Sequence, residues 1–288
     1  MSANAACVTL RRQRLEKDYT KVKLIIFSSL VIALLAIAIF ADFFCPYDPN
    51  IQDNSIALQP PSVEHPFGTD RYGRDMLSRV ISGSQASIFS TLSLVAIISI
   101  AGTIIGVNCG YFSGVIDSVV MRISDVCLAF PGLVFALAIA AVLNGGIQNA
   151  VIALAVISWP KYSRIARSQT LAVKHTNFIA AARLAGSTSF TIITKHILPN
   201  IIGPILVTAM LDIGTMLMEI AGLSFLGLGA KPPIAEWGSM MSSGRSMLQT
   251  YPWVVLFPGV AIFMSVVLFN LLGDTIRDYV DPRNSRIK

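Results

Sequence analysis

Two carboxylates lie within an otherwise apolar stretch, residues 201–225, and are the side chains with the clearest chemical potential in this sequence. Asp212 and Glu219 are seven residues apart, so on a helix they share nearly the same face, with Thr215 and Met216 between them. A charge at bilayer depth is costly and normally faces a bundle interior or a water-filled cavity. This stripe is therefore a candidate lining of a translocation path. The alternative is a helix-packing pair satisfied by neighbouring hydroxyl or backbone groups.

The sequence contains no comparable pattern of residues for catalysis or metal binding. Three histidines fall in different connections on opposite sides of the predicted membrane, so they cannot form one metal site: His65, His175 and His196. Methionines near the carboxylate stripe are better explained as packing residues. The sequence contains no G-x-x-x-x-G-K-[ST] motif, so we expect no ATP hydrolysis by a P-loop in this chain. We predict a protein that is not an enzyme and holds no cofactor.

The composition indicates what positions the stripe. The chain is 54% hydrophobic and 13% charged, too few charges for a water-covered surface. Six stretches are long and apolar enough for membrane helices. They cover approximately residues 24–44, 88–107, 126–143, 147–165, 201–225 and 254–272. The predicted fold is an all-α membrane protein with six transmembrane helices. At the end of the second stretch and just beyond it, Gly102, Gly106 and Gly110 have the spacing of a close helix-packing face.

The positive charges predict the orientation. Of the 22 basic residues, 17 fall in segments that share one side of the membrane: 1–23, 108–125, 160–199 and 273–288. Basic residues concentrate on the cytoplasmic side, so both termini are predicted inside. This topology also explains the basic pI without a nucleic-acid partner. The predicted organisation is a cytoplasmic segment 1–23, a first helix with an extracytoplasmic loop 24–87, a five-helix core 88–272 including a cytoplasmic loop 160–199, and a cytoplasmic tail 273–288.

The cytoplasmic loop predicts a short projecting helix. Asn177 can cap its start, and Phe178, Ala181, Ala182 and Ala185 then fall on one face. Gly186 supplies a stop, because glycine readily adopts the left-handed conformation that ends helices. Small side chains permit close approach, so this helix is expected to sit in a groove of a partner protein.

Residues 178–186 read FIAAARLAG and residues 196–200 read HILPN. Together they resemble the EAA loop of permease subunits in binding-protein-dependent ABC importers. The resemblance implies a coupling helix that docks into an ATPase subunit. Its residues would be Phe178, Ala180, Ala181, Ala182, Arg183, Ala185 and Gly186. The family's glutamate is replaced here by Ala180, so any salt bridge made by that glutamate is absent or relocated.

A second resemblance lies in the extracytoplasmic loop, where residues 65–75 read HPFGTDRYGRD. This run is similar to a signature of the dipeptide, oligopeptide and nickel group, in its second, C-type permease. The signature residues are Gly68, Thr69, Asp70, Gly73, Arg74 and Asp75. Segments 224–229, 236–238, 269–274 and 281–283 resemble the same subunit. Gly68 and Gly73 permit tight turns, and Asp70 can accept hydrogen bonds from free backbone N–H groups, so we expect this loop to be a structural scaffold. The alternative is that the loop contacts a solute-binding protein directly.

The resemblance implies a multi-pass subunit of a bacterial-type cytoplasmic (inner) membrane, in contact with lipid and forming half of a translocation path. Its partners would be a homologous second permease, two ATPase subunits that bind ATP and Mg²⁺, and an extracytoplasmic binding protein. Residues 211–217, LDIGTML, look closer to nickel permeases, which indicates nickel, as a chelate, as the cargo. Dipeptide or oligopeptide import is the alternative. A third hypothesis is an ion-coupled secondary transporter in which Asp212 and Glu219 bind the driving ion.

Overall fold

The computed structural model describes the backbone of residues 3–280 and the side chains of residues 19–279. Five helices are long: α1 (Ala3–Ile39), α3 (Met76–Phe112), α6 (Ile147–Lys174), α9 (Leu198–Phe225) and α11 (Trp253–Val280). The shorter ones are α2 (Ala41–Phe44), α4 (Val115–Ala129), α5 (Gly132–Val142), α7 (Asn177–Leu184), α8 (Ser189–Thr191) and α10 (Trp237–Gly244), with helical turns η1 (Asn54–Ile56), η2 (Ile192–Ile197) and η3 (Arg245–Met247). Within residues 3–280 there is no strand. The all-α prediction is confirmed.

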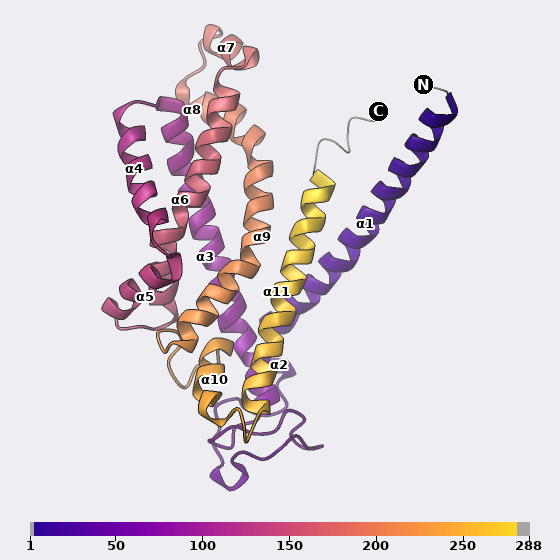
Figure 1. The fold of residues 1–288 in the computed structure, drawn as a ribbon, viewed down its shortest axis with the longest axis vertical. Coiled ribbons are helices and arrows are strands. Elements are labelled where there is room, and N and C mark those ends of the chain that lie inside the picture. Colours follow the sequence, from indigo (N-terminus) through magenta and orange to yellow (C-terminus); the bar gives the residue numbers. More distant parts are fainter. Residues whose placement is uncertain (1–2, 281–288) are drawn as a thin grey trace.

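The long helices run side by side as a bundle, with α1 inclined away from the others (Figure 1). Four segments are long and apolar enough to cross a membrane: Tyr19–Ile39, Met76–Phe112, Ser189–Phe225 and Trp253–Tyr279. The bent pair α4 and α5 would make a fifth. The fourth predicted span, 147–165, forms the first part of α6, whose second half carries basic residues. The protein is thus an all-helical membrane protein with an apolar bundle.

The third predicted span needs correction. Residues 126–143 do not form one helix, because α4 and α5 meet at an angle of 95°. Pro131 lies at the break and Phe130 before it is extended, with φ −100° and ψ 150°. A residue that precedes proline is pushed out of the helical region, so hydropathy alone joins two helices that the backbone separates.

Three helices are longer than predicted. α6 continues through Pro160 to Lys174, so residues 160–174 are helical although the sequence assigned them to a loop. Lys161, Arg164 and Arg167 pair with carboxylates of neighbouring helices, which allows the helix to continue past the point where its hydropathy falls. Likewise, α8 and the π-helical η2 lead directly into α9, and α3 begins at Met76, inside the predicted loop.

The most extensive contact in the bundle joins α3 to α6, and three glycines make it possible. A Cβ atom at Gly106 would lie 2.2 Å from the carbonyl oxygen of Ser163, and one at Gly102 would lie 2.6 Å from that of Trp159. At Gly110 it would meet the carbonyl of Arg167 at 2.9 Å. The predicted glycine face is confirmed, since only glycine allows these backbones to approach so closely.

The two ends of the bundle differ. α7 projects at one end, where the start of α1 and the end of α11 also lie (Figure 1). The opposite end carries α2, α10 and the connection before α3. The predicted tail begins at the end of α11, and its last residues, 281–288, including the matched segment 281–283, lie outside the described residues.

Candidate functional site

The carboxylate stripe of α9 is divided by the structure into two environments. Asp212 is buried and receives hydrogen bonds from two side chains of α6. Lys161 Nζ lies 2.5 Å from Oδ1, and the Tyr162 hydroxyl donates to Oδ2 at 2.8 Å. Asp212 therefore joins α6 to α9, as a packing pair would, while Lys161 keeps half of its side chain exposed.

Glu219 and Thr215 lie on the more open side of the same helix. Thr215 is exposed and Glu219 is half-buried, whereas Met216 is buried. Glu219 forms no hydrogen bond or ion pair with any residue that the structure describes. A carboxylate at this depth without a protein partner needs water or a ligand beside it. Of the four predicted stripe residues, Glu219 and Thr215 thus remain available to line a path.

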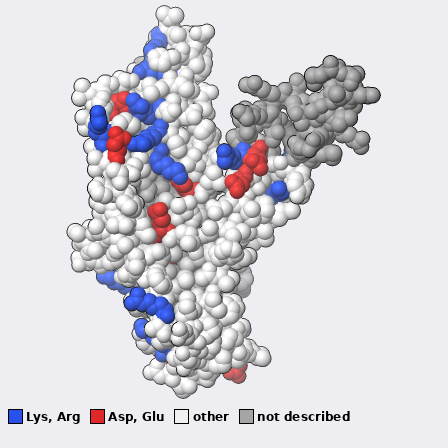
Figure 2. Space-filling view, viewed as in Figure 1, with Lys and Arg blue, Asp and Glu red and all other residues white. Residues whose placement is uncertain are grey.

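Further ion pairs attach α4 to the second half of α6. Arg167 holds Asp117 through two hydrogen bonds of 2.6 Å, in a bidentate arrangement. Arg164 pairs with Asp125 one turn away. Figure 2 shows basic and acidic groups intermingled on the upper part of one face, and acidic groups at its mid-height. One face of the bundle therefore carries charged side chains over its upper part and at its mid-height.

The short helix predicted after residue 177 is present as α7, and it ends just before Gly186, as predicted. Gly186 has φ +82°. Its N–H donates to the carbonyl of Arg183, and the Ser187 N–H donates to that of Ala182, the paired bonds of a Schellman motif. At the other end Thr176, not Asn177, precedes the helix, and its side chain makes no capping bond.

The faces of α7 differ slightly from the prediction. Ile179 is fully buried and Ala182 packs against the core, so these two residues form the inner face. Phe178, Ala181 and Ala185 are exposed, as are Ala180, Arg183 and Gly186. Ala182 was expected on the outer face. It lies three residues after Ile179, on the same side of the helix, so the burial of Ile179 turns Ala182 inward as well.

Tyr111, at the end of α3, connects α7 to the bundle. The Arg183 guanidinium lies 5.6 Å from the centre of its ring, and Lys174 Nζ of α6 lies 5.8 Å from it. The Tyr111 hydroxyl lies 3.3 Å from the Ser189 hydroxyl of α8. Cation–π contacts of this kind stabilise by about 0.5–1 kcal/mol at exposed sites. Movement of α7 would therefore reach three other helices through one aromatic ring.

At the opposite end, all six signature residues are buried. The Asp70 carboxylate accepts hydrogen bonds from the backbone N–H groups of Tyr72 and Arg74 at 2.8 and 3.0 Å. Asp75 caps α3 by accepting a hydrogen bond from the Ser78 N–H at 2.7 Å. Gly73 has φ +69°, and a Cβ atom there would lie 1.7 Å from the carbonyl oxygen of Asp53. These contacts are internal to the loop, which favours the scaffold interpretation over contact with a binding protein.

Two further anchors hold this end together. Asp75 also meets His65 Nδ1 at 2.9 Å. Gly68 has φ +70°, and Thr69 accepts a hydrogen bond on its carbonyl from the indole N–H of Trp253 in α11 at 3.2 Å. The signature loop is thereby fixed to the beginning of α11 as well as to α3.

Segment 236–238, one of those that resemble the C-type permease, begins α10 and attaches it to α3. Glu236 accepts the N–H groups of Gly238 and Ser239 at 2.9 and 2.8 Å, which caps the helix. Burial raises the pKa of Glu236, although these two hydrogen bonds oppose the rise. The Trp237 indole donates to the carbonyl of Val80 at 2.9 Å, so α10 is fixed to α3.

Sequence reasoning missed three residues that complete these groups: Lys161, Tyr162 and Tyr111. Lys161 carried the clearest signal, as a basic residue that directly follows Trp159 and Pro160 in an apolar run. Lys161 and Tyr162 both bind Asp212, which lies 51 and 50 residues further along the sequence. No local spacing predicts contacts of that range.

Comparison with known proteins adds a direct finding. Residues 98–286 match the family model described as binding-protein-dependent transport system inner membrane component. Residues 21–61 match the N-terminal TM domain of oligopeptide transport permease C. The first match includes α7, and the second begins within α1.

Two curated relatives are similar over most of their length. The dipeptide transport system permease protein DppC of Alkalihalophilus pseudofirmus is 42% identical, over 93% of this chain and 88% of the relative. The glutathione transport system permease protein GsiD of Escherichia coli O6:K15:H31 is 44% identical, over 88% and 84%. Among solved structures, the inward-facing MetNI methionine ABC transporter has a chain with TM-score 0.53 and 20% identity, covering 72% of this chain and 98% of that one. That last likeness concerns the fold.

Proposed function

The chain belongs to the family of binding-protein-dependent transport system inner membrane components, and from this premise we propose that it forms half of the translocation path of a peptide importer. Membership makes the chain a multi-pass inner-membrane permease subunit of an ABC importer. Such a subunit works with ATPase subunits and a solute-binding protein, and the ATPase subunits carry out ATP hydrolysis.

Short peptides are the proposed cargo. The relatives described above are named for dipeptide and glutathione transport, and the N-terminal match is to an oligopeptide permease. The nickel expectation from residues 211–217 finds no support in these comparisons and is replaced by the peptide alternative. The ion-coupled alternative also loses its basis, because the family depends on binding proteins and because Asp212 is already paired with Lys161.

The proposed mechanism is alternating access driven through α7. The observation that carries it is the exposed outer face of α7, which projects from the end of the bundle while Ile179 and Arg183 attach it to the core and to Tyr111. Closure of two ATPase subunits, each loaded with ATP and Mg²⁺, pulls this helix and reorients the spans. A contact of equal strength in both states would shift nothing, so the α7 contacts must differ between them.

The path lies between this chain and a homologous second permease. Glu219 and Thr215 contribute its lining from α9, and the polar face seen in Figure 2 is turned towards the partner and away from lipid. α7 and both ends of the chain lie in the cytoplasm. The end with α10 and the signature loop faces outward, where a binding protein delivers the cargo.

Uptake by the reconstituted complex tests the cargo. The chain with its partner subunits and binding protein, in ATP-loaded proteoliposomes, is given labelled dialanine, labelled glutathione or labelled Ni²⁺. We expect accumulation of at least one of the two peptides and none of Ni²⁺. Accumulation of Ni²⁺ without either peptide would overturn the peptide assignment and leave the permease class unaffected.

A further inference from the structure

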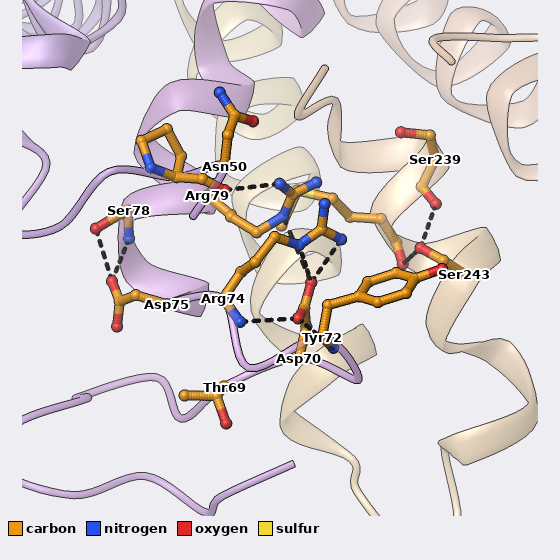
Figure 3. A network of polar contacts seen from close by, with 12 residues as sticks. Asn50, Thr69, Asp70, Tyr72, Arg74, Asp75, Ser78, Arg79, Ser239 and Ser243 are labelled. Atoms are coloured by element: carbon orange, nitrogen blue, oxygen red, sulfur yellow. Dashed lines mark hydrogen bonds and ion pairs between the residues drawn. The ribbon is translucent and has the colours of Figure 1, made fainter. Parts of the chain in front are cut away.

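A small cavity at the outward end contains an unusual number of cations. Its volume is about 220 Å³, and it lies between the signature loop, the start of α3 and the connection from α9 to α10. Arg71, Arg74, Arg79 and Lys231 line it, whereas no carboxylate does. Hydroxyl groups of α10 form the opposite wall, and Figure 3 shows the Tyr72 ring extending towards one of them, Ser243.

The charges of this cavity do not balance within the described chain. Arg74 and Arg79 are both more than nine-tenths buried. They share a single carboxylate, Asp70, whose Oδ2 lies 2.7 Å from Arg74 Nη2 and 3.8 Å from Arg79 Nε. Arg79 also donates to the carbonyl of Pro49 at 2.9 Å. The buried group thus has two cations for one anion (Figure 3).

The rim of the cavity adds positive charge. Arg71 and Lys231 are exposed, and neither forms an ion pair with any residue between 19 and 279. Arg71 instead lies against the Tyr72 ring, 4.6 Å from its centre. Figure 2 shows basic groups gathered on the lower part of the face. Cavity walls of low dielectric concentrate such a field and attract anions.

The fold explains only part of this arrangement. Asp70 and Arg74 shape the signature loop, but a loop needs neither a second buried guanidinium nor two unpaired cations at the rim. Burying excess charge is costly unless a partner arrives. Guanidinium groups match a carboxylate in shape and can bind it through two parallel N–H bonds. The cavity is therefore built for a carboxylate that the chain itself does not supply.

We propose that this cavity binds the terminal carboxylate of the peptide cargo as it enters the path. The inference rests on the proposed peptide import and names the chemical group that the permease itself recognises. The cavity lies at the end opposite α7, where cargo enters, and its volume suits one terminal residue. An acidic side chain of the binding protein carries the same group, so the test separates these two sources.

Labelling of an introduced thiol tests the proposal on the purified complete complex. Ser243→Cys places a thiol on the α10 wall, and its reaction rates with an anionic and a cationic methanethiosulfonate reagent are compared. We expect the anionic reagent to react at least fivefold faster. Lys231→Gln should reduce this ratio about twofold or more. The matched control, Arg245→Gln, removes an exposed cation at the same end that does not line the cavity, and it should leave the ratio unchanged.

Protection of the same thiol identifies the ligand. Dialanine should slow labelling at least threefold, and dialanine amide, which lacks the carboxylate, should not. Equal protection by both compounds, or protection by neither, would overturn the proposal. So would an equal change of the labelling-rate ratio in the Lys231→Gln and Arg245→Gln variants. Protection by the cargo-free binding protein alone would assign the cavity to that partner instead. If dialanine is imported with ATP yet gives no protection, this inference fails while the proposed function stands; if no peptide is imported, the proposed function fails.

Discussion

Asp212 and Glu219 show how two carboxylates on one helix acquire different roles from their neighbours. Asp212 meets Lys161 and Tyr162 of α6 and becomes part of the packing. Glu219, two turns further along α9, has no such partner among the described residues and remains half-buried. The spacing of these residues predicts a shared face, but it does not predict which neighbour each one meets.

The Asp212–Lys161 pair can be tested by a double-mutant cycle. Asp212→Asn should lower stability by about 1–3 kcal/mol, because it leaves polar partners unsatisfied at a buried position. Lys161→Met should lower it at least as much, because Asp212 would remain as a buried carboxylate without a cation. The double variant should recover part of the loss, and thermal unfolding in detergent measures all four proteins. Purely additive losses would contradict a direct pair.

Glu219→Gln should reduce transport and leave stability unchanged. The substitution keeps the shape of the side chain and breaks no ion pair of the described chain, so complex assembly and thermal stability should be unchanged. Peptide uptake should fall about tenfold if this carboxylate faces the path, since a fold-change of that size corresponds to about 1.4 kcal/mol. Normal uptake would remove Glu219 from the path.

At the scale of elements, local signals predict local features well. Apolar runs locate the long helices, the glycine series predicts the α3–α6 contact, and Gly186 marks the end of α7. Features that depend on distant partners are not predictable in this way. α6 extends past Pro160 because Asp117, Asp125 and Asp212 neutralise its basic residues, and these lie on other helices. The break at Pro131 is a backbone property to which a hydropathy average is blind.

The α3–α6 contact predicts a contrast between two glycines. Gly106→Leu should destabilise the protein by about 1–3 kcal/mol, because the side chain would collide with the backbone of Ser163. Gly203→Ala in α9 is the matched control, since a Cβ atom there meets nothing within 4 Å. Alanine is the better helix former, so this variant should be as stable as the parent or more so. Similar melting temperatures for the two variants would argue against close backbone packing at Gly106.

At the scale of the whole molecule, the two ends are chemically distinct. One presents α7 and the ion pairs that Arg164 and Arg167 form with α4. The other contains the buried signature loop, α10 and the cationic cavity. The distribution of basic residues predicts that the first end is cytoplasmic, and the separation of α7 from the signature loop in Figure 1 requires the second end to be outside if the first is inside.

Thiol labelling in spheroplasts tests this orientation. Leu184→Cys in α7 and Val63→Cys in the outer loop change residues that are 91% and 100% exposed. A membrane-impermeant maleimide should label the Val63 variant in spheroplasts and the Leu184 variant only after the membrane is opened. Labelling of the Leu184 variant in intact spheroplasts would reverse the proposed topology.

The central claim is that this chain conducts peptide across the membrane in response to ATP hydrolysis transmitted through α7. ATP-dependent uptake of labelled dipeptide into proteoliposomes tests it most directly, with the parent complex, an Ala181→Glu variant on the exposed face of α7, and an Ala172→Glu control at an exposed position of α6. We predict uptake that requires ATP in the parent and control complexes and is lost in the Ala181 variant. Equal uptake with and without ATP, or parent-like uptake by the Ala181 variant, would contradict the account.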